Sequence, residues 1–298
     1  MAADQIDAAL IIQFSESIHV QAQQTKARLR PHVEVRPMTG ETYAYDGLGP
    51  IEASPVIGRQ QPVQFSDINH LRRQIARQRF ALTLPIDAAD VRGMLMNPQG
   101  EYAKACVRAM ERVFDRIVVG CLFATVYTGR QMGTSLTAAS DGVVTQTATA
   151  GLTYQQLLAI NKTFMDSDVG NDIPEKIVMG IAGSEMLSLM QEVELVNDLY
   201  SQNYAVDKGR MTNAAGIDLI PFAGNVAKPI LPLNSAGSVR NCFAMSTRGV
   251  CVGLSKELAL KVEPRPDLIE VTQVQIVFDL GAVRTEGVLV QQVNTTPS

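Results

Sequence analysis

The chain has 298 residues, of which 46% are hydrophobic and 19% charged, and its formal net charge is −4. This length allows one large domain or two modest ones with a sizeable core. The negative net charge excludes a protein that binds nucleic acid mainly through contacts with its phosphates. The low charged share indicates that some surface is buried against partners.

The N-terminus lacks the charged and apolar regions of a signal peptide, and no apolar run reaches the ~18 residues of a membrane span. We therefore expect a soluble protein that is made in a cytoplasm and makes no contact with a membrane. The four cysteines form no CxxC pair, so we expect buried free thiols in a reducing compartment: Cys106, Cys121, Cys242 and Cys251.

Residues 1–32 are too short for a domain and read as an N-terminal arm. Ile6, Leu10, Phe14 and Ile18 have helical spacing, and a polar stretch follows them. The pattern predicts a short amphipathic helix with an extended tail.

Residues 33–86 predict a long, two-armed β excursion. A Gly- and Pro-rich stretch at 47–61 forms the tip, and the return arm alternates with Phe80, Leu82, Leu84 and Ile86 on one side. A two-stranded ribbon of this kind has no core of its own and is only marginally stable in water. We expect it to lie on a neighbouring copy of the chain.

The excursion is also the basic part of the sequence, with Arg59, His70, Arg72, Arg73, Arg77 and Arg79. Two interpretations stay open at this point. The arginines could be a solvated edge that resists aggregation, or they could dock onto an acidic surface of another subunit.

The strongest helix is predicted over 98–128. Asn97 is a good N-cap, Pro98 suits the first helical position and Gly129 is a plausible stop. Apolar residues follow at helical spacing. The stretch 117–126 is almost entirely apolar or small, which predicts burial on all sides around Gly120.

Helices and strands are mixed in the remaining sequence without a βαβ rhythm, so the class is α+β. We expect a helix over 152–165 with Leu157, Leu158 and Phe164 in the core, and another over 184–196. Strands are expected over 176–182, 216–222, 243–254, 269–279 and 282–293.

The usual signatures of chemistry are missing, which favours a protein that is not an enzyme. There is no phosphate-binding loop, HExxH, GxSxG or GxGxxG motif, and the three histidines do not stand at metal-ligand spacing. An acidic stretch at 166–172 fails the EF-hand spacing. We expect no catalytic site, cofactor or metal.

The order of the parts resembles the major capsid proteins of tailed double-stranded DNA phages, which have the Hong Kong 97-like fold. The most specific stretch is C-terminal, with Gly253 to Glu257, Val262 to Asp267, and a Gly281-Ala282-Val283-Arg284 turn followed by Glu286-Gly287-Val288. Residues 40–50 are also similar to the first arm of the excursion in one branch of this family.

The resemblance implies an architecture of five parts. Residues 1–32 would be the N-terminal arm, 33–86 the E-loop, 87–129 the P-domain with its spine helix, 130–262 the A-domain and 263–298 the C-terminal strands of the P-domain. It also implies self-assembly into pentamers and hexamers of an icosahedral shell around phage DNA, held in the virion after assembly in the host bacterial cytoplasm.

Further partners follow from the same resemblance. The chain has no room for a long N-terminal scaffolding segment, which implies a separate scaffolding protein. The resemblance also implies a portal, and it leaves open whether a decoration protein is present. The E-loop arms contain no lysine, which argues against a crosslink of the lysine–asparagine kind. An encapsulin-like bacterial compartment shell is the alternative, and an unrelated soluble α+β binding protein or enzyme is a more distant one.

We expect the subunit interface to join the basic arm of one copy to acidic positions of the next. The predicted interface residues are Arg59, Arg72, Arg73, Arg77, Arg79, Phe80, Glu101, Glu111 and Asp115.

Overall fold

The computed structural model describes residues 23–53, 55, 58, 65–87, 99–148, 151–169, 175–192, 211–234, 237–265, 267–268 and 271–296. The chain divides into two compact units. The first comprises Met1–Lys26, Arg79–Glu111 and Lys256–Phe278, and the second comprises Ala27–Gln78, Arg112–Ser255 and Asp279–Ser298. The predicted helix of the N-terminal arm lies outside the described residues.

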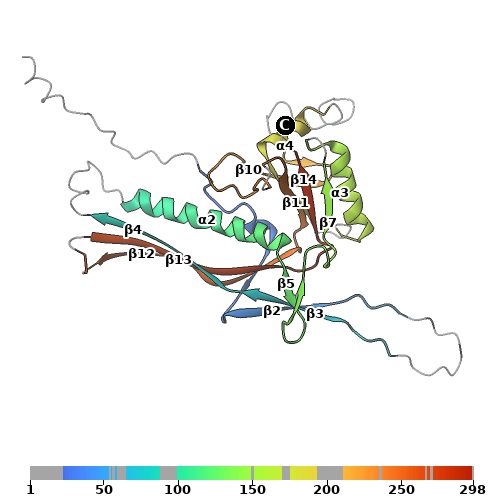
Figure 1. The fold of residues 1–298 in the computed structure, drawn as a ribbon. Coiled ribbons are helices and arrows are strands. Elements are labelled where there is room, and N and C mark those ends of the chain that lie inside the picture. Colours follow the sequence, from blue (N-terminus) through green and yellow to red (C-terminus); the bar gives the residue numbers. More distant parts are fainter. Residues whose placement is uncertain are drawn as a thin grey trace, which may run out of the picture. The chain divides into compact units, whose positions relative to one another are not determined.

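The first unit holds the start of a long helix and the outer parts of long strands (Figure 1). These elements are α2 (Gln99–Phe123), β4 (Gln78–Asp87), β12 (Val250–Arg265) and β13 (Val271–Arg284). Along β4, residues 80, 82, 84 and 86 are more buried than the residues between them, which confirms the predicted alternation. Since α2, β4, β12 and β13 all continue into the second unit, each unit is built from segments far apart in the sequence.

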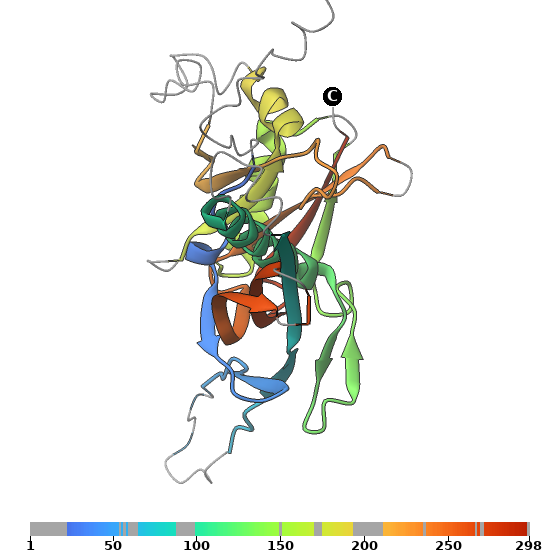
Figure 2. The same ribbon diagram turned by 90° about the vertical axis from the view of Figure 1, so that its left-hand side faces the viewer.

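A six-stranded sheet forms the main core of the second unit. Its order is β7 (Val144–Thr147), β14 (Val290–Thr295), β11 (Arg240–Ser246), β8 (Ile177–Ala182), β10 (Ile217–Phe222) and β9 (Asn213–Ala214). Every residue of the apolar β8 is buried, as expected of a strand covered on both faces. The helices α3 (Tyr154–Asp166) and α4 (Gly183–Met190) belong to the same unit. Figure 2 shows the ribbon turned by 90° from the view of Figure 1, with α4 in yellow.

A second sheet of this unit carries the hairpin. Its order is β2 (Thr42–Leu48), β3 (His70–Ala76), β5 (Val126–Thr128) and β6 (Thr134–Leu136). The third sheet has the order β1–β12–β13–β4, in which β1 (Glu34–Pro37) runs parallel to β12. A short 3-10 helix at Arg30–His32 precedes β1.

The predicted excursion is therefore shorter than a ribbon of all 33–86. Of the strands described within 33–86, only β2 and β3 pair as an antiparallel hairpin, whereas β1 pairs with β12 and β4 joins the sheet beside β13. The base of the hairpin is held by its own chain, because Met38, Ile75, Val126, Cys251 and Val283 form one buried cluster.

The predicted helix over 98–128 is five residues too long at its end. Val126, Tyr127 and Thr128 form β5 instead, since β-branched and aromatic residues fit a pleated surface better than a helix end. The predicted burial on all sides of 117–126 is also wrong, because Gly120, Ala124 and Thr125 are exposed.

Two further predictions need correction. Leu158 is 44% exposed and lies outside the core, while Leu157 and Phe164 are fully buried as predicted. The strands expected to break between Asp279 and Ala282 form one continuous strand, β13, through Gly281. All four cysteines are buried free thiols, which confirms that prediction.

Candidate subunit interface

The two faces of the β2–β3 hairpin have different surroundings. Asp46 is paired with Arg72 across the two strands, and Tyr45 is paired with Arg73. Because side chains alternate along a strand, Arg72 and Arg73 point to opposite faces. Arg72 is partly exposed, whereas only 4% of Arg73 is exposed.

Arg72 forms an ion pair with Asp46 on the open face. Its Nε lies 2.6 Å from Oδ1 of Asp46, and its Nη2 donates to Oδ2 at 3.3 Å. The hydrogen bond from Arg72 lowers the pKa of Asp46 below its ordinary value. Both side chains are about half exposed, so this pair orders the hairpin surface and adds little to stability.

Arg73 belongs to a buried network that sequence reasoning missed. Its two terminal nitrogens each donate to one carboxylate oxygen of Asp141, both at 2.7 Å, in the bidentate geometry that suits arginine. Nε of Arg284 donates to Oδ2 of the same carboxylate at 2.8 Å. Three segments far apart in the sequence therefore meet at one aspartate.

The network holds two positive charges and one negative charge. The carbonyl oxygens at the end of α2 contribute further partial negative charge. Arg284 donates to the carbonyl oxygens of Leu122 and Ala124, the latter at 3.3 Å. The last carbonyls of a helix have no partner within it and carry roughly half a negative charge. Arg284 therefore closes the C-terminal end of α2 and joins it to Asp141.

The acidity of Asp141 reflects these partners. Burial acts to raise the pKa of its carboxyl, but the hydrogen bonds and charges of Arg73 and Arg284 outweigh burial and lower that pKa below its ordinary value. Asp141 is thus ionised in the folded protein at neutral pH.

Two glycines of the C-terminal motif allow the close packing around this network. A Cβ atom at Gly281 would lie 2.2 Å from the backbone oxygen of Ala76, and one at Gly287 would lie 1.9 Å from the backbone oxygen of Asp141. Real Cβ atoms essentially never come this close to another heavy atom. The Gly281-to-Gly287 stretch thus fits the base of the hairpin and the turn that holds Asp141.

The predicted interface residues differ in their local surroundings. Arg59 lies outside the described residues. Arg77 and Phe80 are partly buried and Arg79 is exposed, while Glu101 pairs with Lys104 at 2.7 Å and Glu111 is partly buried.

Two of the predicted residues are used inside their own chain. Arg73 is bound in the buried network. Asp115 is fully buried and accepts the backbone amides of Arg28 at 2.9 Å and Leu29 at 3.1 Å. A charged group held in this way cannot reach another subunit without leaving buried donors unpaired.

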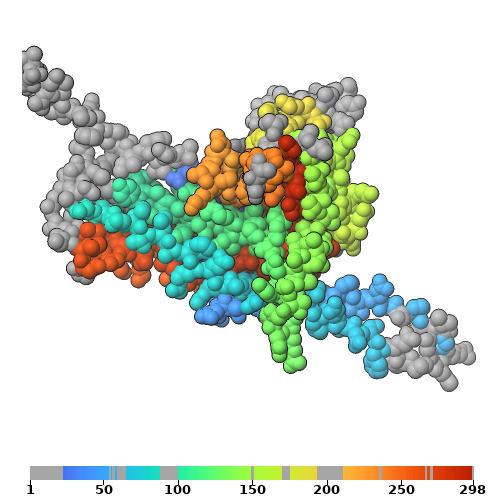
Figure 3. Space-filling view, viewed as in Figure 1, coloured from blue at the N-terminus to red at the C-terminus, as the bar shows by residue number. Residues whose placement is uncertain are grey.

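The outer part of the hairpin carries large exposed apolar side chains instead. Phe65 is 93% exposed and Leu48 65%, and Ile51 and Ile68 are also exposed. Figure 3 shows this segment extending beyond the body of its unit, with β5 and β6 beside its base. The sequence signal for this feature is a set of apolar residues within and just after the Gly- and Pro-rich stretch 47–61, namely Leu48, Ile51, Phe65 and Ile68.

A groove of about 430 Å³ runs between the base of the hairpin and the exposed side of α2. Its lining is largely small and apolar, with one arginine: Gln74, Ala76, Gln78, Arg116, Ile117, Gly120, Cys121, Ala124, Thr125, Val126, Tyr127, Ala282 and Val283. This surface offers van der Waals contact but no pair of acid and base.

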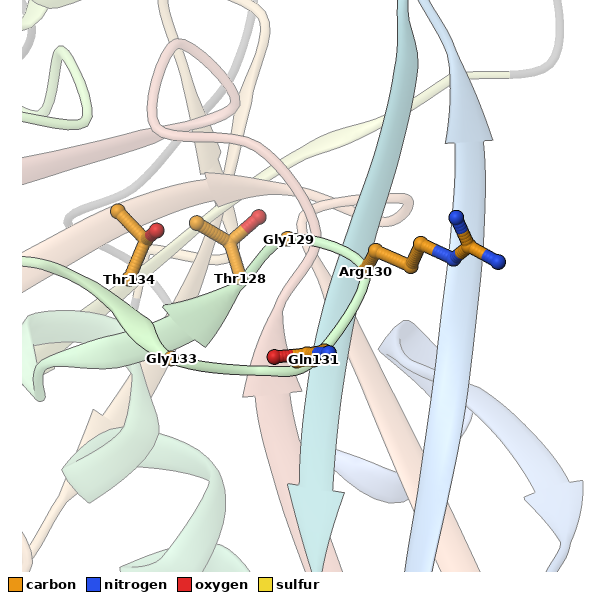
Figure 4. Close-up of a pocket in the computed structure, with 6 residues that line it drawn as sticks. All are labelled: Thr128, Gly129, Arg130, Gln131, Gly133 and Thr134. Atoms are coloured by element: carbon orange, nitrogen blue, oxygen red, sulfur yellow. The ribbon is translucent and has the colours of Figure 1, made fainter.

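A second hollow, of about 570 Å³, lies at the turn between β5 and β6. In Figure 4 the Arg130 side chain extends away from the turn, and Thr128 and Thr134 lie at its base. The residues that line it include no histidine, cysteine or carboxylate. In the described parts of the chain, no three His, Cys, Asp or Glu side chains cluster at a spacing that could hold a metal, and no helix is long and apolar enough to cross a membrane.

Comparison with solved structures shows the fold of this chain. The capsid of cyanophage Pam1 is 12% identical with a TM-score of 0.74, and 97% of each chain is covered. The head of Helicobacter pylori bacteriophage KHP40 gives the same values, and the capsid of cyanophage P-SCSP1u is 10% identical with a TM-score of 0.71, over 97% of this chain and 94% of that chain. The chain therefore has the Hong Kong 97-like fold of phage capsid subunits.

The family follows from the sequence itself. The family model described as phage capsid protein matches residues 6–294, and the chain belongs to that family. It is a phage major capsid protein, and this result favours a capsid over a compartment shell or an unrelated α+β protein. No curated protein matches the sequence.

Proposed function

We propose that copies of this chain assemble through pentamers and hexamers into an icosahedral shell that encloses phage double-stranded DNA. The observation that carries this proposal is the hairpin, whose base is anchored in its own unit while its outer part exposes large apolar side chains. Large exposed apolar side chains that are concentrated in one segment favour association with another protein surface. A second copy of the chain is the partner that a shell supplies.

The apolar side chains would provide most of the binding energy between subunits. Fully burying a side chain such as that of Phe65 or Leu48 contributes roughly 1.5–3 kcal/mol. Charge pairs at the rim contribute only about 0–1 kcal/mol each. Repetition over every subunit of a closed shell multiplies both contributions.

Arg77 and Arg79 remain the charged residues that we assign to this contact, with Glu101 and Glu111 of a neighbouring copy as their acidic partners. Arg73 and Asp115 are withdrawn from it, because each is buried in its own chain. Arg72 lies at the surface, where it forms an ion pair with Asp46.

The role we propose is structural, without catalysis. DNA would be enclosed without sequence recognition, since the chain is acidic overall and basic patches are local. A separate scaffolding protein, a portal and a decoration protein complete the assembly that we propose for the host bacterial cytoplasm. The four buried thiols suit a reducing compartment.

Size-exclusion chromatography and electron microscopy of the purified protein test assembly directly. We expect closed particles in the megadalton range that protect DNA from nuclease when formed during infection. A stable 32.3 kDa monomer under all assembly conditions would contradict the proposal.

The charged contact has its own test. Arg77→Glu combined with Arg79→Glu should leave the subunit folded and reduce the yield of particles at least tenfold. The matched control is Arg130→Glu with Lys228→Glu, which changes the net charge equally at two other exposed positions of the chain. Normal yield from the first variant, or equal loss from both, would refute a contact at Arg77 and Arg79.

A further inference from the structure

The base of the hairpin contains an ionic joint made by three segments of one unit. Arg73 comes from β3, Asp141 from the turn before β7, and Arg284 from the end of β13. The exposed fractions of their side chains are 5%, 5% and 0%. Nη1 of Arg73 also donates to the backbone oxygen of Arg284 at 3.2 Å, so the two arginines are linked directly.

The joint lies where the hairpin leaves the core. Arg73 is the buried residue of β3 that is nearest the tip, since Leu71 and Arg72 are partly exposed and His70 is exposed. Phe65 is eight residues further out, at most roughly 26 Å away in an extended chain. A rotation of about 10° at Arg73 would move Phe65 by roughly 5 Å. Small changes at the joint therefore become large displacements of the apolar tip.

Stability alone does not account for these buried charges. Desolvation of a buried ion pair often cancels its Coulombic attraction, and well-packed apolar residues can replace such a pair without loss of stability. This network is also incompletely satisfied, because Nη2 of Arg284 is buried without a hydrogen-bond partner in the described part of the chain. Bidentate ion pairs do, however, impose a direction that apolar contacts lack.

We propose that Arg73, Asp141 and Arg284 are positioning residues that fix the direction of the β2–β3 hairpin relative to the C-terminal end of α2. The bidentate Arg73–Asp141 pair sets the rotation of β3, and Arg284 ties that pair to the carbonyls of Leu122 and Ala124. The role in shell formation rests on the proposed function, but the geometric role belongs to the single subunit.

The first experiment measures the direction of the hairpin in the unassembled subunit. Spin labels at Leu48→Cys and Leu158→Cys report the distance between the hairpin and α3, and both positions are exposed while the native thiols are buried. We expect one narrow distance distribution in the otherwise native chain. The variant with Arg73→Met, Asp141→Leu and Arg284→Met should melt within a few degrees of it, and its distance distribution should be at least twofold broader.

A second pair of variants tests whether Arg73 sets the direction of the hairpin if the apolar variant does not fold. Arg73→Lys keeps the charge but loses the bidentate geometry. Its neighbour Arg72→Lys makes the same change on the open face of the same strand. We expect Arg73→Lys to broaden the distance distribution and to reduce particles of uniform diameter at least threefold, while Arg72→Lys leaves both unchanged.

The outcomes separate this inference from the proposed function. A broad distribution in the native chain, or equal behaviour of Arg73→Lys and Arg72→Lys, would overturn the positioning role even if shells form. Failure of the native chain to form particles would overturn the shell instead. In that case the label distances still decide whether Arg73 sets the direction of the hairpin.

Discussion

Arg72 and Arg73 are neighbours in sequence with opposite surroundings. The first is half exposed and meets Asp46 across the hairpin, and the second is buried against Asp141. The same residue type at adjacent strand positions therefore has a surface role and a core role. This contrast makes the two aspartates a matched pair for mutation.

Asp141→Asn should lower the free energy of unfolding of the unassembled subunit by about 3–5 kcal/mol, the usual cost of removing one member of a buried ion pair. Two buried arginines would then remain with no negative side chain in the network. Urea unfolding at pH 7 measures the change. The control, Asp46→Asn, should change the free energy of unfolding far less, because solvent screens the exposed pair with Arg72, and a similar loss in both variants would contradict the assignment.

The pH dependence of this difference has a definite sign. The pKa of Asp141 is lowered in the folded state, so its contribution to stability is fully present above the unfolded pKa of about 3.9. The contribution is lost as the pH falls through the folded pKa. The gap between the native chain and Asp141→Asn should be constant from pH 7 to 5 and shrink below pH 4, by up to ~1.4 kcal/mol per pH unit.

The glycines also differ in whether a side chain would fit at their position. Gly287→Ala should destabilise the subunit by about 1–3 kcal/mol, because its Cβ would meet the backbone oxygen of Asp141. Gly120→Ala should stabilise it by about 0.5–1 kcal/mol, since nothing lies within 4 Å of a Cβ there and alanine is the better helix former. Thermal unfolding compares the two, and destabilisation by Gly120→Ala would show that this glycine is needed for packing.

At the scale of elements, the hairpin is the feature to which we assign the proposed contact between subunits. Leu48 and His70 are its last paired residues, so residues 49–69 can be replaced by Asn-Gly, the preferred two-residue turn. The shortened subunit should fold with near-native stability, because the replaced segment lies outside the buried cluster at the hairpin base. It should form at least tenfold fewer closed particles by electron microscopy.

A matched control exists in the same sheet. Thr128 and Thr134 are paired at the β5–β6 turn, so residues 129–133 can also be replaced by Asn-Gly. We expect this variant to fold and to assemble normally. Normal assembly by the first variant, or loss of assembly by both, would contradict the role of the hairpin tip.

The elements differ in how well the sequence predicted them. β4, β8 and the body of α2 follow from alternation, an apolar run and helical spacing, which are local signals. The end of α2 was misplaced because Val126–Thr128 are recruited by a pairing with Arg73 and β6, which no local pattern encodes. Leu158 was misassigned because helical spacing alone did not show which side of α3 faces the sheet.

The site was predictable only in part for the same reason. The basic character of the excursion is a property of one segment, so the sequence shows it directly. The buried network joins positions 73, 141 and 284, and its members look like ordinary surface charges in the sequence. The resemblance pointed to Gly281 and Arg284 as characteristic, but only the close approach to Ala76 and Asp141 explains why they are needed.

At the scale of the whole molecule, both units are assembled from distant parts of the chain. β1 pairs with residues 251–254, and Arg73 is held by Asp141 and Arg284. Such nonlocal pairing slows folding, because the chain between the partners must be ordered before the contact is formed.

This separation has a consequence for the timing of biosynthesis. Arg284 leaves the ribosome about 200 residues after the hairpin, a delay of about 10–40 s at bacterial rates of elongation. A nascent chain can form β2 and β3 early, but under the proposed positioning role it would orient them only after Arg284 has been made. Nascent copies on one polysome would then present hairpins without a fixed direction, which would disfavour premature association.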